Sequence, residues 1–546
     1  MTDPDRTRGL ARTSAIIGAG TLLSRVTGFL RVSALVALGV GHVTDVYTIA
    51  NSTPNIVYEL LLGGILTATL VPLFVESHER DDPGATDAIN TVALAVLIAG
   101  TILGILAAPW IVRAYGSAGQ AHPFTPVQVA NRHALGTDLL RWFMPQMLFY
   151  GITALATAML NARRRFAAAA FAPVLNNVLV ITMLLAVGRA TSAAPTVRSV
   201  LDDPVLVVLL GLGTTVGVVA MTLVLLPAVR QSGGSFHWRF EPRHPAVRQL
   251  ARLSGWTIGY VAANQVAFFV VLVLAYRSSS DVTLYIAAFT FFQLPHGLLA
   301  VSVMTALGPE LASRHQAADM EGFRDHFSAG LRILLVVMIP SAAGLAILAR
   351  PLISALLDHG DFSATDVATT SNTLVAFAIG LIAFSIYLYA VRAFSSMKDT
   401  RTPFLLNLVE NGVNIATAFA LYEWRGVEGL AWSWSIAYTV GAVLALVALR
   451  RRVGQFDGRR LASTACRIAL ALIPAGAVAV LIDHLLGSAT PGRSFLTLAA
   501  CGLAAGTVFV GAAALLGIDL IGMMRQILRR ENRGGIDLPT PNPADG

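Results

Sequence analysis

The chain has 546 residues, of which 55% are hydrophobic and only 13% charged, and its net charge is +8. Soluble domains carry about 25% charged residues, so this composition excludes an ordinary soluble protein and indicates a chain that crosses a membrane many times. Cys466 and Cys501 lie in separate apolar stretches, which argues against a disulfide framework and against a zinc site.

Hydrophobic windows predict an all-α polytopic membrane protein with about fourteen membrane-spanning helices. The first window begins after a basic segment but runs past the length of a signal peptide, so we expect it to be retained as a helix. The windows cover residues 16–38, 52–75, 89–112, 138–160, 168–188, 204–229, 254–275, 282–312, 331–356, 365–391, 403–422, 427–449, 467–486 and 495–518.

The first window contains two arginines near its centre, within "SRVTGFLRVSALVAL" at 24–38. An arginine at the centre of a bilayer costs about 2.5 kcal/mol or more. No carboxylate in the first twelve windows is an obvious permanent partner for both Arg25 and Arg31. We therefore expect an anionic ligand or a water-filled cavity to stabilise them.

The basic residues predict the orientation in the membrane. If the N-terminus is cytoplasmic, most of the 39 lysines and arginines fall in cytoplasmic connections. The positive-inside rule then places both termini in the cytoplasm, and it explains the positive charge without a nucleic-acid partner.

Short echoes in the sequence predict two related halves. The segment "LARTS" at 10–14 resembles "LARLS" at 250–254, Pro72 corresponds to Pro309, and "NNVLVI" at 176–181 resembles "ENGVNI" at 410–415. All three offsets are similar, and each half has six windows, so we expect two six-helix lobes as parallel repeats around a central cavity. The predicted parts are an N-terminal lobe at 1–230, a cytoplasmic linker at 231–252, a C-terminal lobe at 253–450, two further helices at 451–520 and a cytoplasmic tail at 521–546.

Two polar groups inside the C-terminal windows are candidates for function. Asn264 and Gln265 stand 240 positions after Ser24 and Arg25, which suggests equivalent points in the two lobes. Asn407, Glu410 and Asn411 make the eleventh window unusually polar. They are candidates for coupling to a monovalent cation, with helix packing as the alternative and the membrane potential as a second energy source.

Three classes of protein fit these features: a flippase for a lipid-linked oligosaccharide, a related exporter of drugs or of another polyprenyl-linked oligosaccharide, and an intramembrane transferase. A transferase should carry a paired-aspartate metal motif at one membrane face, and the two "DDP" segments at 81 and 202 fall on opposite sides. Arginines in the first window favour an anionic carrier, so we expect a transporter and no enzyme.

The stretch "SRVTGFLRVSALVALGVGHVTDVYTIANSTPNIVYELLLGGILTATLVPLF" at 24–74 resembles the N-terminal signature of the MurJ/MviN family of lipid II flippases. The segments "FQLPHGLLAVSVMTALGPELA" at 292–312 and "SSMKDTRTPFLLN" at 395–407 are similar to other parts of that family. The resemblance implies the fourteen-helix fold of the multidrug/oligosaccharidyl-lipid/polysaccharide (MOP) exporter superfamily, with two lobes around a cationic cavity. Departures from the family pattern fall at Val32, Tyr58, Glu59, Thr290 and Gln293.

The resemblance also implies the role and the partners. The chain would flip lipid II, the peptidoglycan precursor on which cell wall and cell shape depend, across the bacterial cytoplasmic membrane by alternating access. It would bind lipid II and membrane lipids, need no cofactor apart from a coupling monovalent cation or the membrane potential, and act beside cell-wall synthesis or regulatory proteins. The candidate substrate-binding residues are Ser24, Arg25, Arg31, Asp45, Asn55, Asn264, Gln265 and Gln293.

Overall fold

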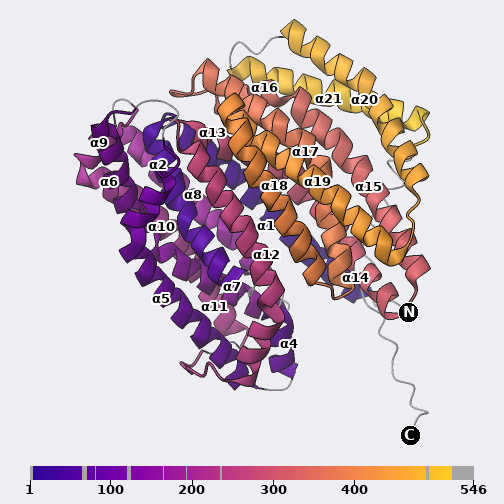
Figure 1. Cartoon of the computed structure of the whole chain (residues 1–546), viewed down its shortest axis with the longest axis horizontal. Coiled ribbons are helices and arrows are strands. Elements are labelled where there is room, and N and C mark those ends of the chain that lie inside the picture. The colour runs from indigo at the N-terminus through magenta and orange to yellow at the C-terminus, as the bar shows by residue number, and fades with distance from the viewer. Residues whose placement is uncertain are drawn as a thin grey trace.

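The computed structural model of the chain describes residues 4–63, 70–79, 82–119, 124–163, 165–191, 194–233, 236–486 and 491–518. These residues form helices joined by short connections, with no strand among them (Figure 1). The predicted cytoplasmic tail at 521–546 lies outside the described residues. The all-α prediction is confirmed.

The first half of the chain forms helices that pack mainly on one another, drawn in indigo and purple in Figure 1. They are α1 (Pro4–Val36), α2 (His42–Tyr58), the π-helical segment η1 (Glu59–Gly63), α4 (Leu70–Glu79), α5 (Pro83–Tyr115), α6 (Pro126–Phe143), α7 (Pro145–Ala162), α8 (Ala167–Ala190), α9 (Val197–Leu201), α10 (Pro204–Leu223) and α11 (Leu225–Gln231).

The second half forms another group, beside which the last two helices pack at the edge far from the first group (Figure 1). Its elements are α12 (Pro245–Ala275), α13 (Asp281–Pro295), the π-helical segment η2 (His296–Ala300), α14 (Val301–Gln316), α15 (Met320–Ile347), α16 (Ala349–Leu357), α17 (Ala364–Ser396), α18 (Arg401–Arg425), α19 (Val427–Val453), α20 (Gly458–Leu486) and α21 (Pro491–Leu515). The lobe boundaries and the repeat relation stay predictions.

Twelve helical stretches of the described residues are long and apolar enough to cross a membrane. They correspond to the third to fourteenth predicted windows. The first window lies in α1, which carries both arginines, and the second extends over α2, η1 and α4.

Local sequence signals explain where many helices begin. Prolines occupy the first position of α5, α6, α7, α10, α12 and α21, where the missing N–H costs no helical hydrogen bond. Asp82 caps α5 by accepting from the Ala85 N–H at 3.1 Å, and Thr125 and Gln128 form a capping box at the start of α6.

One predicted helix is interrupted. The window 331–356 was expected to be one helix, but α15 ends at Ile347 and α16 begins at Ala349. Pro351 has no N–H to donate to the carbonyl of residue 347, which explains the break. The helix α12 begins at Pro245, inside the linker predicted at 231–252, but its part that is apolar enough to cross a membrane begins at Ser254, so the bounds of the linker stay a prediction.

The two π-helical segments occupy matching positions. Glu59 begins η1 and His296 begins η2, and these residues are separated by the same number of positions as Pro72 and Pro309. π-helical turns interrupt regular helices and are frequent at functional sites. The match is what two related halves would produce.

Candidate functional site

Arg25 points from α1 toward the second group of helices. Its side chain is exposed, and its guanidinium lies over Gly297 of η2, where Nη2 would be 3.1 Å from a β-carbon. It also lies within electrostatic range of His296. The glycine leaves the guanidinium room beside the π-helical turn.

Arg31 faces the first group of helices instead. It is half-buried and lies within electrostatic range of Tyr47 in α2 and Tyr150 in α7. Among the described residues, no carboxylate forms an ion pair with Arg25 or Arg31. The two guanidinium groups therefore diverge around α1, and both are available to an anion.

Other contacts hold α1 between the two groups. Asn177 of α8 donates to the Ser24 carbonyl at 3.2 Å and to Thr27 Oγ1 at 3.1 Å. On the other side, the rings of Phe29 and Phe291 are 5.0 Å apart, and Ser33 Oγ donates to the Leu356 carbonyl at 3.0 Å. Ser24, a predicted substrate residue, thus contributes its backbone to helix packing.

Asp45 joins the two groups at one end of the bundle. Its carboxylate is fully buried and accepts from the Ser280 N–H at 2.8 Å, the Thr283 N–H at 2.9 Å and Thr283 Oγ1 at 2.6 Å. It therefore caps the first turn of α13 from α2. Asp45, a predicted substrate residue, makes this capping contact in the structure.

Arg132 makes a second bridge at the same end, and no local sequence pattern separates it from other arginines predicted on the outer side. It is buried, donates through Nη2 to the Tyr276 carbonyl at 3.2 Å, and stacks on the rings of Phe124 and Tyr276 at 4.5 and 4.0 Å. Because Tyr276 ends α12, this contact also links α6 of the first group to the second group. A cavity of about 400 Å³ lies beside it, lined among others by His42, Asn131 and Arg198.

The remaining predicted substrate residues lie apart from one another. Asn55 is exposed on α2, and Gln265 is half-buried on α12. Gln293 is half-buried on α13, four positions before Gly297, so it lies near the helix face that Arg25 contacts.

Asn264 belongs to a cluster with α18. Its Oδ1 accepts from Asn407 Nδ2 at 2.9 Å and from Asn411 Nδ2 at 3.0 Å. The structure thus brings together Asn264, Asn407 and Asn411, which the sequence assigned to two different sites.

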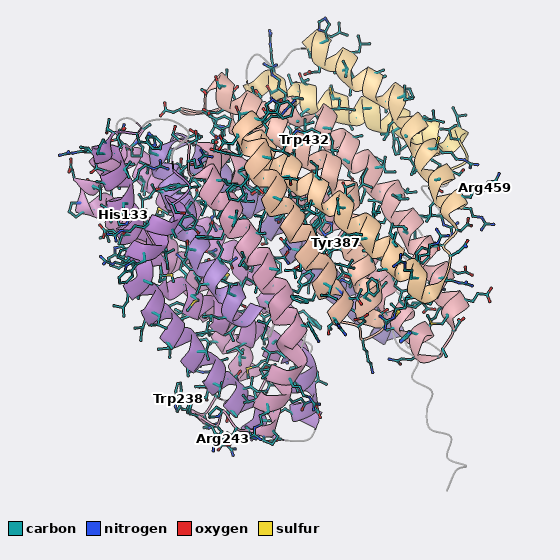
Figure 2. The ribbon with its side chains drawn as sticks, viewed as in Figure 1. His133, Trp238, Arg243, Tyr387, Trp432 and Arg459 are labelled. Atoms are coloured by element: carbon teal, nitrogen blue, oxygen red, sulfur yellow. The ribbon has the colours of Figure 1, made fainter. Side chains whose placement is uncertain are left out.

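Glu410 lies in the same part of α18. It is fully buried, and no described residue donates a hydrogen bond to either carboxyl oxygen. The phenols of Tyr260, Tyr387 and Tyr438 lie within electrostatic range of it; Figure 2 labels Tyr387 inside the second group. Asn407 Oδ1 also lacks a donor, so three side-chain oxygens here are free to bind a cation, and the carboxyl of Glu410 can instead take up a proton.

Comparisons with known proteins agree with this architecture. A family model described as "Lipid II flippase MurJ" matches residues 35–500. The chain is 27% identical over 451 residues to the probable lipid II flippase MurJ of Vibrio cholerae, covering 81% of this chain and 82% of that one. It is 29% identical over 461 residues to the lipid II flippase MurJ of Burkholderia cenocepacia, covering 81% and 84% of the two chains.

Solved structures show the same fold. A lipid II flippase MurJ in an inward closed conformation matches with a TM-score of 0.73 and 20% identity, over 93% of this chain and all of that one. An inward-facing multidrug resistance transporter of the MOP superfamily matches with a TM-score of 0.62 and 13% identity, over 78% and 94% of the two chains. Since the family model matches well over half of the sequence, the chain belongs to the lipid II flippase MurJ family, a family of bacterial membrane transporters rather than of enzymes.

Proposed function

We propose that the protein moves lipid II from the inner to the outer leaflet of the cytoplasmic membrane by alternating access, with Arg25 and Arg31 binding the pyrophosphate. Family membership supports the substrate. The observation that carries the role of the arginines is their position on α1, between the two groups of helices and without a carboxylate partner among the described residues.

The chemistry of the guanidinium group suits this ligand. Arginine keeps its charge in a membrane and offers planar paired donors that match phosphate oxygens. Six residues along a helix place the two α-carbons roughly 9 Å apart along the axis and about 120° apart around it, so a shared pyrophosphate requires both long side chains to bend toward the space between the two groups of helices. Because Arg25 contacts η2 and Arg31 faces α2 and α7, an anion held by both would connect the two groups of helices.

Alternating access also needs a closure that opens and reforms. The contacts of Asp45 with α13 and of Arg132 with the end of α12 are candidates for the outer closure. They lie at the end that the distribution of arginines assigns to the outside, with both termini in the cytoplasm. Their hydrogen bonds must break when the cavity opens outward.

We further propose that Glu410, Asn407 and Asn411 couple transport to a monovalent cation or a proton. A buried carboxyl whose oxygens have no donor is costly unless it is protonated or binds a cation. Carboxyl and amide oxygens are suitable ligands for a hard cation, so the residues fit such an ion. The alternative energy source remains the membrane potential.

The experiment uses a bacterium depleted of its own lipid II flippase and complemented with this chain. A periplasmic enzyme that cleaves lipid II then measures how much of it has reached the outer leaflet. We expect cleavage to be restored. If growth and cleavage stay at the level of the empty vector while the protein is abundant in the membrane, the substrate is another polyprenyl-linked oligosaccharide.

A further inference from the structure

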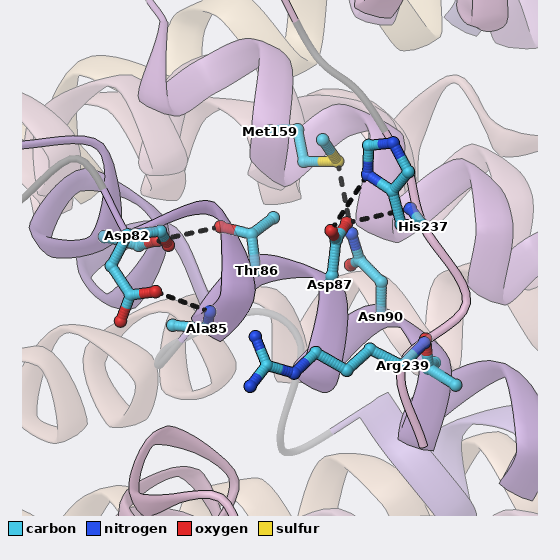
Figure 3. Close-up of polar contacts among 10 residues, drawn as sticks. Asp82, Ala85, Thr86, Asp87, Asn90, Met159, His237 and Arg239 are labelled. Atoms are coloured by element: carbon cyan, nitrogen blue, oxygen red, sulfur yellow. Dashed lines mark hydrogen bonds and ion pairs between the residues drawn. The ribbon is translucent and has the colours of Figure 1, made fainter. Parts of the chain in front are cut away.

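Residues 236–240, in the connection between α11 and α12, lie as an extended segment against the first turns of α5 (Figure 3). The His237 N–H donates to Asp87 Oδ1 at 3.1 Å, and His237 Nδ1 contacts Asp87 Oδ2 at 3.2 Å. Two residues on, the Arg239 N–H donates to Thr91 Oγ1 at 2.9 Å. Since Asp87 and Thr91 are buried, the segment is fixed to the body of the protein at two points.

These contacts give the depth of the segment in the membrane. Thr91 lies one turn, about 6 Å, further along α5 than Asp87. The apolar window of this helix begins at residue 89. The segment between His237 and Arg239 therefore runs beside α5 at the level where the polar end of the helix passes into its apolar part.

The side chains of this segment alternate between two faces. His237 and Arg239 contact α5, although their side chains stay 76% and 48% exposed, and the Arg239 guanidinium lies over Gly84 so closely that a methyl group there would collide with it. Phe236, Trp238 and Phe240 face outward and are 47%, 60% and 58% exposed. The rings of Phe236 and Trp238 are 6.4 Å apart. We call these three residues the aromatic strip.

We infer that the aromatic strip inserts into the boundary between head groups and acyl chains of the lipid bilayer and anchors the connection between α11 and α12 there. Aromatic side chains, tryptophan above all, are enriched at this depth, because their apolar rings leave water while tryptophan keeps a donor at the polar boundary. Arg243 and Arg248 are exposed on the next part of the chain, where they suit phosphate groups of lipids. Figure 2 labels Trp238 and Arg243 together at this end of the molecule.

The anchor is independent of what the transporter carries. It fixes the connection between the two groups of helices both to α5 and to the membrane surface. Only the turn at residues 241–244 is then left to follow a movement of α12.

The test measures where Trp238 lies in a reconstituted protein. The full chain and its Trp238→Phe variant are placed in phosphatidylcholine vesicles containing lipids brominated either near the carboxyl end or near the methyl end of the acyl chain. The difference between the two emissions reports Trp238 alone among the seven tryptophans. We expect the shallow bromine to quench this difference emission at least about twofold more than the deep bromine or aqueous iodide does.

A double variant and a control variant test whether Asp87 and Thr91 hold the segment in place. Asp87→Ala with Thr91→Val should release the segment and make the Trp238 difference emission sensitive to iodide. Asp203→Ala, which removes the cap of α10 instead, should leave it unchanged. Iodide quenching that exceeds lipid quenching in the parent protein would overturn the inference, and so would protection from both quenchers, which would mean that another protein surface covers the strip.

Discussion

Asp45 and Thr283 are 238 positions apart, yet one carboxylate oxygen of Asp45 accepts both the backbone N–H and the hydroxyl of Thr283. The contact ties α2 to the first turn of α13 and so joins the two groups of helices at one end. A carboxylate that satisfies several donors of a helix start is among the stronger hydrogen-bonding arrangements in proteins. If the protein opens at this end, these hydrogen bonds must break.

Asp45→Asn should weaken this closure. The amide keeps the shape but loses the charge, and leaving a buried N–H group without its partner costs about 1–3 kcal/mol. Spin labels are placed at Val127→Cys and Trp424→Cys, two exposed sites on different groups of helices, in a chain that also carries Cys466→Ser and Cys501→Ala. Double electron–electron resonance then measures the distance between the two labels. We expect longer distances to gain population.

The matched control is Asp366→Asn, which changes an aspartate of an exposed capping box in α17. It should leave the distance distribution as in the parent. An unchanged distribution for Asp45→Asn would mean that this contact does not hold the closed state.

Arg132 should depend energetically on Asp45. The two opposite charges lie within electrostatic range, and both are buried. Removing one charge removes its attraction for the other, so each single variant should lower the melting temperature, and Asp45→Asn with Arg132→Met should lower it by less than the sum. Thermal unfolding in detergent measures all four proteins. If the decrease in melting temperature of the double variant equals the sum of the two single decreases, the contacts of Asp45 and Arg132 are energetically independent.

Glu410→Gln should uncouple transport from its ion. The amide cannot gain or lose a proton and is a weaker cation ligand, while its volume is unchanged. Transport by the parent in vesicles should respond to pH or sodium gradients, and transport by the variant should not. Glu423→Gln, at an exposed position of the same helix, is the control. A variant that keeps the gradient response would exclude Glu410 from coupling.

Asp399 gives a prediction about pH. Burial raises the pKa of its carboxyl, but hydrogen bonds from Thr402 and the ion pair with Arg452 outweigh burial and hold the pKa below its ordinary value of 3.8. A carboxyl with a depressed pKa stabilises the folded state above the unfolded pKa and loses this effect as pH falls through the folded one.

Asp399→Ala should therefore lower stability by about 1 kcal/mol at neutral pH and by less in acid. Thermal unfolding of the parent and of the variant, measured from neutral pH down to the lowest pH at which the protein still folds, gives the difference in stability at each pH. A difference that grows as the pH falls would contradict the assignment.

The sequence predicted the features that depend on composition along one helix. The apolar windows follow from hydrophobic composition. The arginines of α1 and the polar residues of α18 stand out because they do not match the apolar windows in which they lie. Asn264 was recognised as polar, but its contact with Asn407 depends on how α12 crosses α18, which no local pattern contains.

The contacts of Asp45 and Arg132 between the two groups of helices could not be predicted for the same reason. Asp45 was noticed from a family resemblance, but its use as a cap for α13 depends on the packing of two distant helices. Arg132 carries no local sign of burial, because two rings from other segments cover it. The break at Leu348 could not be predicted from Pro351 alone, because Pro340 lies inside the uninterrupted α15.

The most direct test of the account compares Arg25→Ala, Arg31→Ala, Arg25→Lys and Arg31→Lys in the flippase-depleted cell, with membrane levels measured for each. Lysine keeps the charge but loses the paired donors, so the account predicts that both alanine variants fail to support growth and that the lysine variants support it partly. Arg189→Ala, an exposed arginine at the end of α8, should grow normally. Normal growth and normal outer-leaflet lipid II with both alanine variants at normal abundance would contradict the assignment of the arginines to the pyrophosphate.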